Sequence, residues 1–520
     1  MDAMKTGFQI RKGRAMPLRV TLITSVFLSF AIASAAAQGN ETTGSTGEKE
    51  TQTRSRGTSA GKPSPRRYTK LKKAPPTSQG IPGATTAVGI ARNQGQTAAA
   101  SALRPGTLEF GNGITMFLNY TGEVAGNPVG GIRQGSAYAG QIFFGIDGNL
   151  EQLAGIEGGS AHVVVTQRHG RDLTSDYIGS NTSVQEVFGG GQTARLSLLS
   201  YEQKLFDNHF DVEVGRLPAQ GSFFSSPVYC NFQNNGICGS PTFVFKDSNF
   251  TYFPVSTWGA HAKFWLDDDF KYFLHVGAYE VNPRTQLPTD NGIDWSTKGA
   301  TGFHVPIELG YSTTFANDAY PRNYGIGAVI DQSHYSDPIL DTAGSRTLFS
   351  GLDPLTRFGR SFIFARFDQM IWRPDLTAPQ GLTVFGLAMK GTGGRQIEDY
   401  YLAAGLVQTG TFDARPYDTV AAMFSLQKFS SLGLADVRAA RTSLGLDSAD
   451  VATTQYMLEV NYGIQLTPAI RITPNLQYIV NPDQTRYPFR AKSIPNAFVI
   501  GTKLSVDLFT LAGLAKGIGQ

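Results

Sequence analysis

Hydrophobic and polar positions alternate with a period of two through the last part of the chain, from Tyr456 to Leu508. Successive side chains of a β-strand point to opposite faces, so each run has one apolar face and one face carrying residues such as Glu459, Arg471 and Lys503. This pattern predicts strands. The apolar positions of its first run are Tyr456, Leu458, Val460, Tyr462, Ile464 and Leu466.

The length of these runs separates a membrane sheet from a half-buried soluble one. Strands of soluble domains usually have about five or six residues, whereas a tilted strand needs roughly nine to eleven to cross a bilayer. The runs here reach about that length or more. They therefore predict a transmembrane antiparallel β-barrel, an all-β fold class.

After Gly106, clusters of Gly, Asn, Asp and Pro separate sixteen such runs, which agrees with the even strand number of bacterial barrels and with a water-filled lumen. Short and long gaps also alternate toward the C-terminal end, as periplasmic turns and outer loops do. A short helix is expected within residues 434–444. The runs cover residues 113–121, 136–148, 159–168, 193–206, 209–216, 250–265, 270–281, 302–313, 322–332, 360–373, 379–390, 398–409, 417–428, 453–466, 469–480 and 497–508.

The first residues resemble a secretory signal. Five basic residues precede an apolar run at residues 20–33, and Ala35 to Ala37 offer a cleavage site before Gln38. The run is short for a retained membrane helix, and no later stretch has about 18 consecutive apolar residues. We expect residues 1–37 to be a signal peptide and the mature chain to act in the outer membrane.

Residues 38–105 are rich in Thr, Ser, Gly, Gln, Pro and Ala, and such a segment buries too little apolar surface to offset its ordering entropy. We expect a disordered tail. It carries eleven Lys or Arg and three acids, a net charge of +8, and the signal carries +4. Because the whole chain is +4, residues 106–520 carry −8.

The densest basic patch of the tail, residues 66–73, could dock on anionic cell-wall polymer or lipopolysaccharide, or it is a solvated linker. Nucleic acid is not an expected partner, because the signal directs the chain away from it. The acidic barrel disfavours anionic solutes.

Several blocks of sequence, in order, resemble the carbohydrate-selective outer-membrane porins of the OprB type. The resemblance covers roughly residues 106–509. It implies a sixteen-stranded barrel that passes glucose and related sugars by diffusion, with a constriction of charged and aromatic side chains. The tail and the extension at residues 510–520, beyond the expected last strand, depart from the family pattern. The blocks are FDVEVGRL (210–217), SSPVYCNFQNNGICG (225–239), PVSTWGA (254–260), GAYEVNP (277–283), NYGIQLTP (461–468) and PNLQYIVNP (474–482).

Cys230 and Cys238 are the only cysteines, with seven residues between them in a segment rich in Gly and Asn. In an oxidising periplasm this spacing favours a disulfide that stiffens the loop, and a loop of this kind could narrow the pore. A metal site is the alternative, but no His lies nearby. We expect no metal and no cofactor.

With the apolar parity outward, the charged positions of the strands line the lumen. Carboxylates and guanidinium groups exchange paired hydrogen bonds with sugar hydroxyls, and aromatic rings pack on the sugar ring. The same charges could instead only keep the channel hydrated. The candidate sugar-contacting clusters are Glu213 and Arg216 beside Tyr229, and Arg366 and Asp368 beside Trp372.

Enzyme chemistry is not expected, since the chain lacks G-x-S-x-G, H-E-x-x-H and P-loop motifs and its seven histidines are scattered. The sequence predicts a sugar-selective porin. A general porin without sugar preference and an envelope-anchoring protein that uses the basic tail are the alternatives. Expected partners are sugars, outer-membrane lipid with lipopolysaccharide, cell-wall polymer for the tail and further copies of the chain in a homo-oligomer.

Overall fold

Sixteen long strands form the wall of the molecule. The computed structural model describes residues 106–239, 241–378 and 380–517, so the expected signal (1–37) and basic tail (38–105) lie outside the described residues. Each of the sixteen predicted runs overlaps one strand. The strands are β2 (Ile114–Val129), β3 (Gly135–Asn149), β4 (Gly159–Gly170), β5 (Ala194–Leu205), β6 (Phe210–Leu217), β7 (Thr257–Trp265), β8 (Tyr272–Val281), β9 (Gly302–Ser312), β10 (Arg322–Asp341), β11 (Pro354–Trp372), β12 (Gly381–Gly393), β13 (Glu398–Thr409), β14 (Thr419–Phe429), β15 (Thr454–Thr467), β16 (Ile470–Val480) and β17 (Ala497–Asp507).

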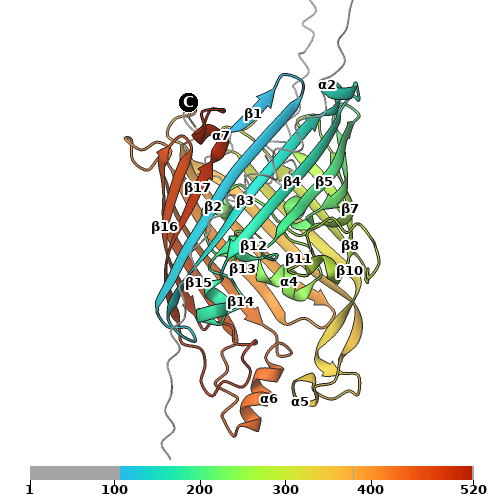
Figure 1. The fold of residues 1–520 in the computed structure, drawn as a ribbon, viewed down its shortest axis with the longest axis vertical. Helices are drawn as coiled ribbons and strands as arrows, with labels where there is room; N and C mark the ends of the chain where they lie inside the picture. Colours follow the sequence, from blue (N-terminus) through green and yellow to red (C-terminus); the bar gives the residue numbers. More distant parts are fainter. Residues whose placement is uncertain (1–105, 240, 379, 518–520) are drawn as a thin grey trace, which may run out of the picture. The chain divides into compact units, whose positions relative to one another are not determined.

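The sheet closes on itself. Every strand from β2 to β16 pairs antiparallel with the next, and β17 returns to pair with β2, where Lys503 lies opposite Glu123 (Figure 1). A short strand, β1 (Thr107–Phe110), forms a hairpin with β2. Closure gives every long strand a paired neighbour on both sides, so the backbone N–H and C=O groups within the bilayer find their partners inside the sheet. The predicted sixteen-stranded antiparallel barrel is confirmed.

Burial alternates along the strands in the predicted sense. On β15, Leu458 and Val460 are exposed on the outer wall, whereas Met457, Glu459 and Asn461 are buried on the inner side. The apolar parity therefore faces the membrane, and the parity carrying the charged residues faces the lumen.

One run differs from its strand in a way that matters for the lumen. The predicted run 250–265 becomes a strand only at Thr257. Pro254 has no N–H to give to a ladder, and the side chains of Phe250, Phe253 and Val255 are buried. Residues 250–256 therefore belong to the preceding connection.

Connections at the two ends of the barrel differ in length. One end has tight turns such as residues 206–209 and 468–469, and it also carries α2 (Leu150–Ala154) and α7 (Leu508–Leu511). The other end carries α5 (Thr347–Ser350) and α6 (Ala435–Ser443), at the bottom of Figure 1. The helix expected within residues 434–444 is α6. In bacterial outer-membrane barrels the short turns are periplasmic and the long loops are extracellular, so the end with tight turns is periplasmic and the loop-rich end is extracellular.

The helices of this barrel are minor elements. None of those in the described residues is long and apolar enough to pass through a membrane. Three of them, η3 (Thr174–Ile178), η4 (Glu186–Phe188) and η6 (Pro283–Gln286), lie in connections at the extracellular end.

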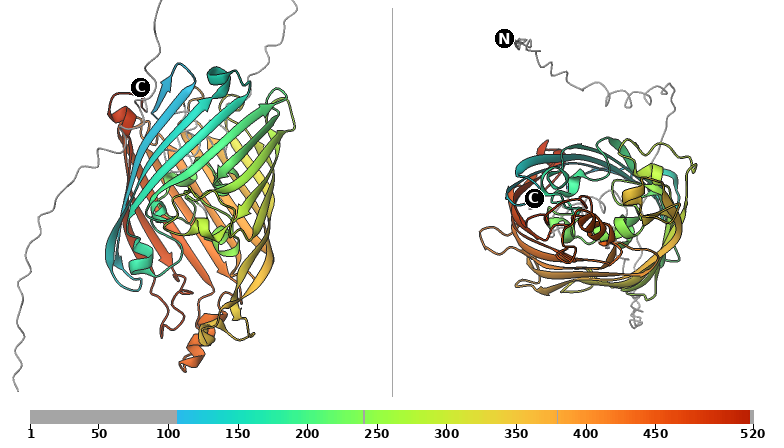
Figure 2. Two further views of the ribbon diagram at one scale, coloured as in Figure 1. Left: turned by 45° about the vertical axis from the view of Figure 1, so that its right-hand side comes forward. Right: turned by 90° about the horizontal axis from the view of Figure 1, so that it is seen from below.

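The longest connection, residues 218–256, folds back inside the barrel, and we call it the inner loop. It contains α3 (Ala219–Phe223), η5 (Tyr229–Asn231) and α4 (Thr242–Asp247). The view along the barrel shows green segments of this region within the ring of strands (Figure 2, right). The main hydrophobic core thus lies in the lumen, where rings of the inner loop pack on inward-facing Phe143, Phe362, Phe364 and Phe385.

Candidate functional site

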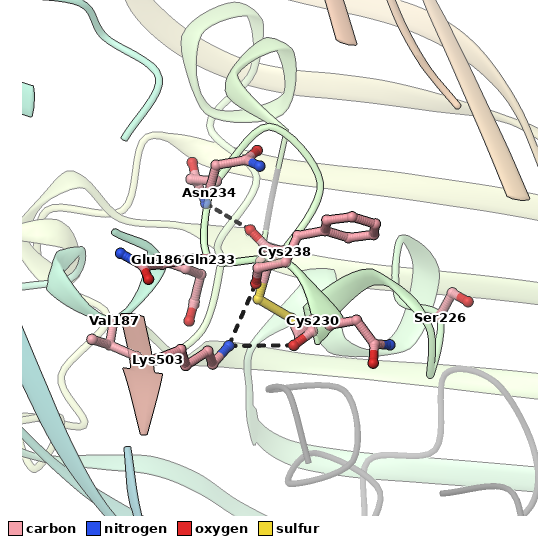
Figure 3. The surroundings of a disulfide bond; sticks show 12 residues. Glu186, Val187, Ser226, Cys230, Gln233, Asn234, Cys238 and Lys503 are labelled. Atoms are coloured by element: carbon pink, nitrogen blue, oxygen red, sulfur yellow. Dashed lines mark hydrogen bonds between the residues drawn. A yellow bond between two sulfur atoms is a disulfide. The ribbon is translucent and has the colours of Figure 1, made fainter. Parts of the chain in front are cut away.

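The disulfide organises the middle of the inner loop. Cys230 and Cys238 are joined by an S–S bond of 2.04 Å, as their spacing predicts, and both are buried. The bond closes a hairpin in which the Cys238 N–H donates to the Asn234 carbonyl at 3.2 Å (Figure 3). Among the described residues no cluster of three or more His, Cys, Asp or Glu could hold a metal ion.

Two wall residues hold this hairpin by opposite charges. The Glu459 carboxylate accepts hydrogen bonds from the backbone N–H groups of Gln233 and Asn234, at 3.0 to 3.1 Å, and from the Asn234 side chain at 2.6 Å. The Lys503 ammonium donates to the carbonyls of Cys230, at 3.3 Å, and Phe232, at 3.5 Å (Figure 3). The negative carboxylate thus faces backbone N–H groups and the positive ammonium faces backbone carbonyls. Both residues position the loop.

A second contact lies on the opposite wall, on β9 to β11. The Arg366 guanidinium makes a two-nitrogen contact of 2.7 Å with one oxygen of Glu308. It also donates to the Ser225 carbonyl of the inner loop at 3.4 Å. The neighbouring Asp368 accepts from Ser226 at 2.9 Å and from Asn323 at 2.6 Å. Arg366 and Asp368, which the sequence predicted together, therefore meet the inner loop side by side.

Tyr229 lies on the inner loop with its ring against Phe385, at a centroid distance of 5.5 Å. Its hydroxyl is buried and has no hydrogen-bond partner within the described part of the chain, and the same holds for the second oxygen of Glu308. The charges that act on this hydroxyl are those of Arg366, Asp368 and Glu308. The structure therefore brings Tyr229 to the Arg366 cluster, whereas the sequence analysis placed it with Glu213 and Arg216.

Glu213 begins a separate polar row on β6 to β8. Its carboxylate accepts from Ser200 at 2.5 Å and lies 3.0 Å from Nε2 of His261. Nδ1 of His261 is 3.1 Å from Nε2 of His275. The ring of Phe223, from the first helix of the inner loop, stacks on His275 at 4.1 Å. Glu213 thus faces the lumen, but its carboxylate is already hydrogen-bonded to side chains of the wall.

The structure does not bring Arg216 to Glu213. The two residues are three positions apart on β6, so they point to opposite faces of a regular strand. Arg216 shares the parity of Val214, which is 48 % exposed on the outer wall, but its own side chain is fully buried. It pairs with Trp258, whose ring lies 5.7 Å from the guanidinium, and donates to the Ser256 carbonyl.

Trp372 is likewise absent from the Arg366 cluster. A register shift between Met370 and Trp372 inserts an extra residue into the end of β11, which reverses the parity that the sequence implies. Trp372 pairs with Leu382 and is 47 % exposed, at the periplasmic edge of the outer wall. That position suits an interfacial aromatic residue better than a solute contact.

Sequence reasoning missed the apolar part of the lumen and the contacts of α4. The signal for the first was present, because Phe362, Ile363 and Phe364 are consecutive apolar residues, as in a strand covered on both faces. No comparable signal existed for Lys246, which reaches Asp483 at 2.5 Å across 237 positions of sequence.

Most charged side chains that are buried in the lumen form ion pairs with side chains of opposite charge. Each of five basic residues lies within 4 Å of a carboxylate on a different element. The pairs are Arg366 with Glu308, Lys503 with Glu123, Arg168 with Glu186, Arg360 with Asp331, and Lys246 with Asp483. A neutral solute with several hydroxyls can exchange hydrogen bonds with such pairs without bringing a charge that must be desolvated.

Comparison with known proteins agrees with this architecture. Residues 133–508 match the model of the family described as "Carbohydrate-selective porin, OprB family". Porin B of Pseudomonas aeruginosa is 30% identical over 415 residues, which span 75% of this chain and 87% of that protein. The putative porin QuiX of Acinetobacter baylyi is 26% identical over 407 residues, spanning 74% and 87%.

A solved structure extends the likeness to three dimensions. The high-pH structure of Pseudomonas putida OprB superposes with a TM-score of 0.68 at 29% identity, covering 76% of this chain and 94% of that one. The family match covers well over half of the chain. The matched residues form most of the closed barrel and the inner loop. The chain belongs to the OprB family of carbohydrate-selective porins and is an outer-membrane channel.

Proposed function

We propose that glucose and related monosaccharides diffuse through this lumen past the inner loop, and that Arg366, Asp368, Glu308 and Tyr229 contact their hydroxyl groups. The observation that carries the proposal is the pairing of Arg366 with Glu308 and the presence of two unpartnered polar atoms, the Tyr229 hydroxyl and the second Glu308 oxygen. Both atoms are buried, so the contact requires the inner loop to shift as the sugar passes. A sugar hydroxyl both donates and accepts, so it suits each of these groups.

Compensation of charge favours this substrate class over ions. An anion or cation entering the cluster must lose part of its hydration shell while facing a pair that is already satisfied. A sugar loses weaker hydrogen bonds to water and regains them from the paired side chains. The ring of Tyr229 adds an apolar surface beside the polar groups.

The test is ion current through the purified protein in a planar bilayer while glucose or a longer sugar is titrated. We expect a saturable block that weakens in Arg366→Ala and in Asp368→Asn. The loss of one hydrogen bond to a charged group, about 1.5–3 kcal/mol, would raise the half-blocking concentration by about 10-fold or more.

Trp372→Phe is the matched control, because this residue lies on the outer wall. Its block should equal that of the unmodified protein. A large ohmic conductance that no sugar changes would reject the sugar site and make the channel a general porin.

The remaining partners are also proposals. The basic tail, residues 38–105, would dock on anionic cell-wall polymer or lipopolysaccharide, and copies of the barrel would associate as a homo-oligomer. Deleting the tail should then lower envelope integrity and leave sugar uptake unchanged. The lumen itself is proposed to carry out no covalent chemistry.

A further inference from the structure

We propose that Lys246 is a positioning residue that locks α4 of the inner loop against the extracellular loops, and that this lock sets the aperture of the channel. The ion current through the pore reports the aperture without any sugar. The proposal therefore goes beyond the sugar site, and it can fail while that site stands.

Lys246 lies at the end of α4 and makes two buried ionic contacts. Its ammonium is 2.5 Å from a carboxylate oxygen of Asp483 and 3.6 Å from one of Glu398. The side chains of Asp483 and Glu398 are 1% and 0% exposed, and that of Lys246 is 11% exposed. Lys246 is thus a cation shared by two buried carboxylates that belong to other parts of the chain.

Asp483 extends this contact to a third connection. It lies near the start of the extracellular connection at residues 481–496, and its carboxylate also accepts from the Asn181 side chain at 2.6 Å. Asn181 belongs to the connection at residues 171–193 and donates in addition to Thr485 at 2.9 Å. One carboxylate therefore joins the inner loop to two other extracellular connections.

The adjacent residue strengthens the attachment of α4 to the wall. The Asp247 carboxylate accepts from the backbone N–H of Ile397 at 2.5 Å and from that of Glu398 at 2.9 Å, where β13 begins. Arg360 of β11 donates to the Lys246 carbonyl at 3.4 Å. The end of α4 is therefore fixed both to β11 and to the start of β13.

Removing the ammonium would leave three carboxylates close together in a buried site. Breaking a buried ion pair on one side is strongly unfavourable, because the remaining charge has no partner. A polar hollow of about 340 Å³, lined by Glu398 and by residues including Arg395, Gln396 and Ser430, gives water a route to the Glu398 end of this site. If α4 moves away from the wall, water hydrates the carboxylates that remain charged, and this movement widens the passage.

The decisive variant is Lys246→Met, which keeps the length of the side chain and removes its charge. In KCl without sugar, we expect a higher single-channel conductance and more open-channel current noise than in the unmodified protein. Lys246→Arg should restore the original current, because it keeps the cation. The conductance and noise of the double variant Lys246→Met with Asp483→Asn should lie between those of the unmodified protein and those of Lys246→Met, since removing both partners is less disruptive than removing one.

The matched control is Lys390→Met. Lys390 pairs with Asp399 at 2.9 Å, but the two side chains are 56% and 46% exposed on the outer wall beside the same hairpin. Its conductance should not change. Folding of every variant is checked by the heat-dependent mobility of the barrel in gels, and Asp483→Asn serves as the test if Lys246→Met does not fold.

An unchanged conductance and noise in folded Lys246→Met, or in folded Asp483→Asn, would overturn the lock. Failure of Lys246→Arg to restore the current would overturn the role of the charge. Sugar block is measured on the same channels: its absence in the unmodified protein would reject the sugar site alone, whatever the conductance of the variants.

Discussion

Glu459 on β15 and Lys503 on β17 bind the same hairpin of the inner loop, one through its backbone N–H groups and the other through its backbone carbonyls. Glu459 accepts from the N–H groups of Gln233 and Asn234, and Lys503 donates to the carbonyl groups just before them. The two wall charges thus act on a segment that the disulfide has already closed. This relationship explains why a loop rich in Gly and Asn stays ordered within a wide barrel.

Replacing Glu459 by Gln should loosen the hairpin. The amide keeps one acceptor but loses the charge that strengthens several hydrogen bonds, at a cost of about 1.5–3 kcal/mol. We expect a lower temperature for the heat-dependent shift in gel mobility and noisier current. Glu151→Gln, on the exposed helix of a periplasmic turn, is the control and should change neither quantity. Equal behaviour of the two variants would show that Glu459 does not support the loop.

Removing the disulfide by the double change Cys230→Ser and Cys238→Ser should destabilise the inner loop but not the barrel. A closed loop of this length limits the unfolded chain by roughly 2–3 kcal/mol. Because Glu459 and Lys503 still hold the hairpin, we expect a folded channel with faster current fluctuations. A protease added to the purified protein should cut the loop more readily than in the parent. Identical digestion of the two proteins would contradict this expectation.

The Arg366 and Glu308 pair should control ion selectivity with opposite signs. Arg366→Met leaves a buried carboxylate, so the reversal potential in a salt gradient should shift toward cation preference. Glu308→Gln leaves the guanidinium, so the shift should go toward anions. Joining both changes should return the potential close to that of the parent, as expected when two charges compensate each other. Shifts of the same sign in both single variants would exclude compensation.

The conductance should depend on pH through Asp483. Burial alone would raise the pKa of its carboxyl, but the Lys246 ammonium and neighbouring N–H donors hold that pKa below its usual value. The contact is therefore complete above the ordinary Asp pKa of about 3.9 and is lost only as pH falls through the lowered value. The parent and Asp483→Asn should differ at pH 7 and converge only below about pH 3.9. Convergence near pH 6 would show that the carboxylate is not stabilised.

The alternation of apolar and polar residues determined the strand count and the outward parity, because both depend on a period that each strand carries in its own sequence. All sixteen runs became strands, and the charged positions Glu459 and Lys503 face the lumen. The cysteine spacing was also a local signal. The consecutive apolar residues Phe362 to Phe364 could have shown that this part of the wall is covered on its inner side as well.

The site depended on contacts between residues far apart in sequence. The alternation predicted the wrong face for Trp372, because an extra residue at a β-bulge reverses the side to which the following side chains point. The grouping of Arg216 with Glu213 was wrong because residues three apart on a strand point to opposite sides. The contacts of Glu459 with Asn234 and of Lys246 with Asp483 join positions separated by more than two hundred residues. The sequence by itself determined a closed barrel with a polar inner face, since period and length are local. Only the tertiary structure decided which charges stay available to a solute, because the inner loop takes up the others once it folds into the lumen.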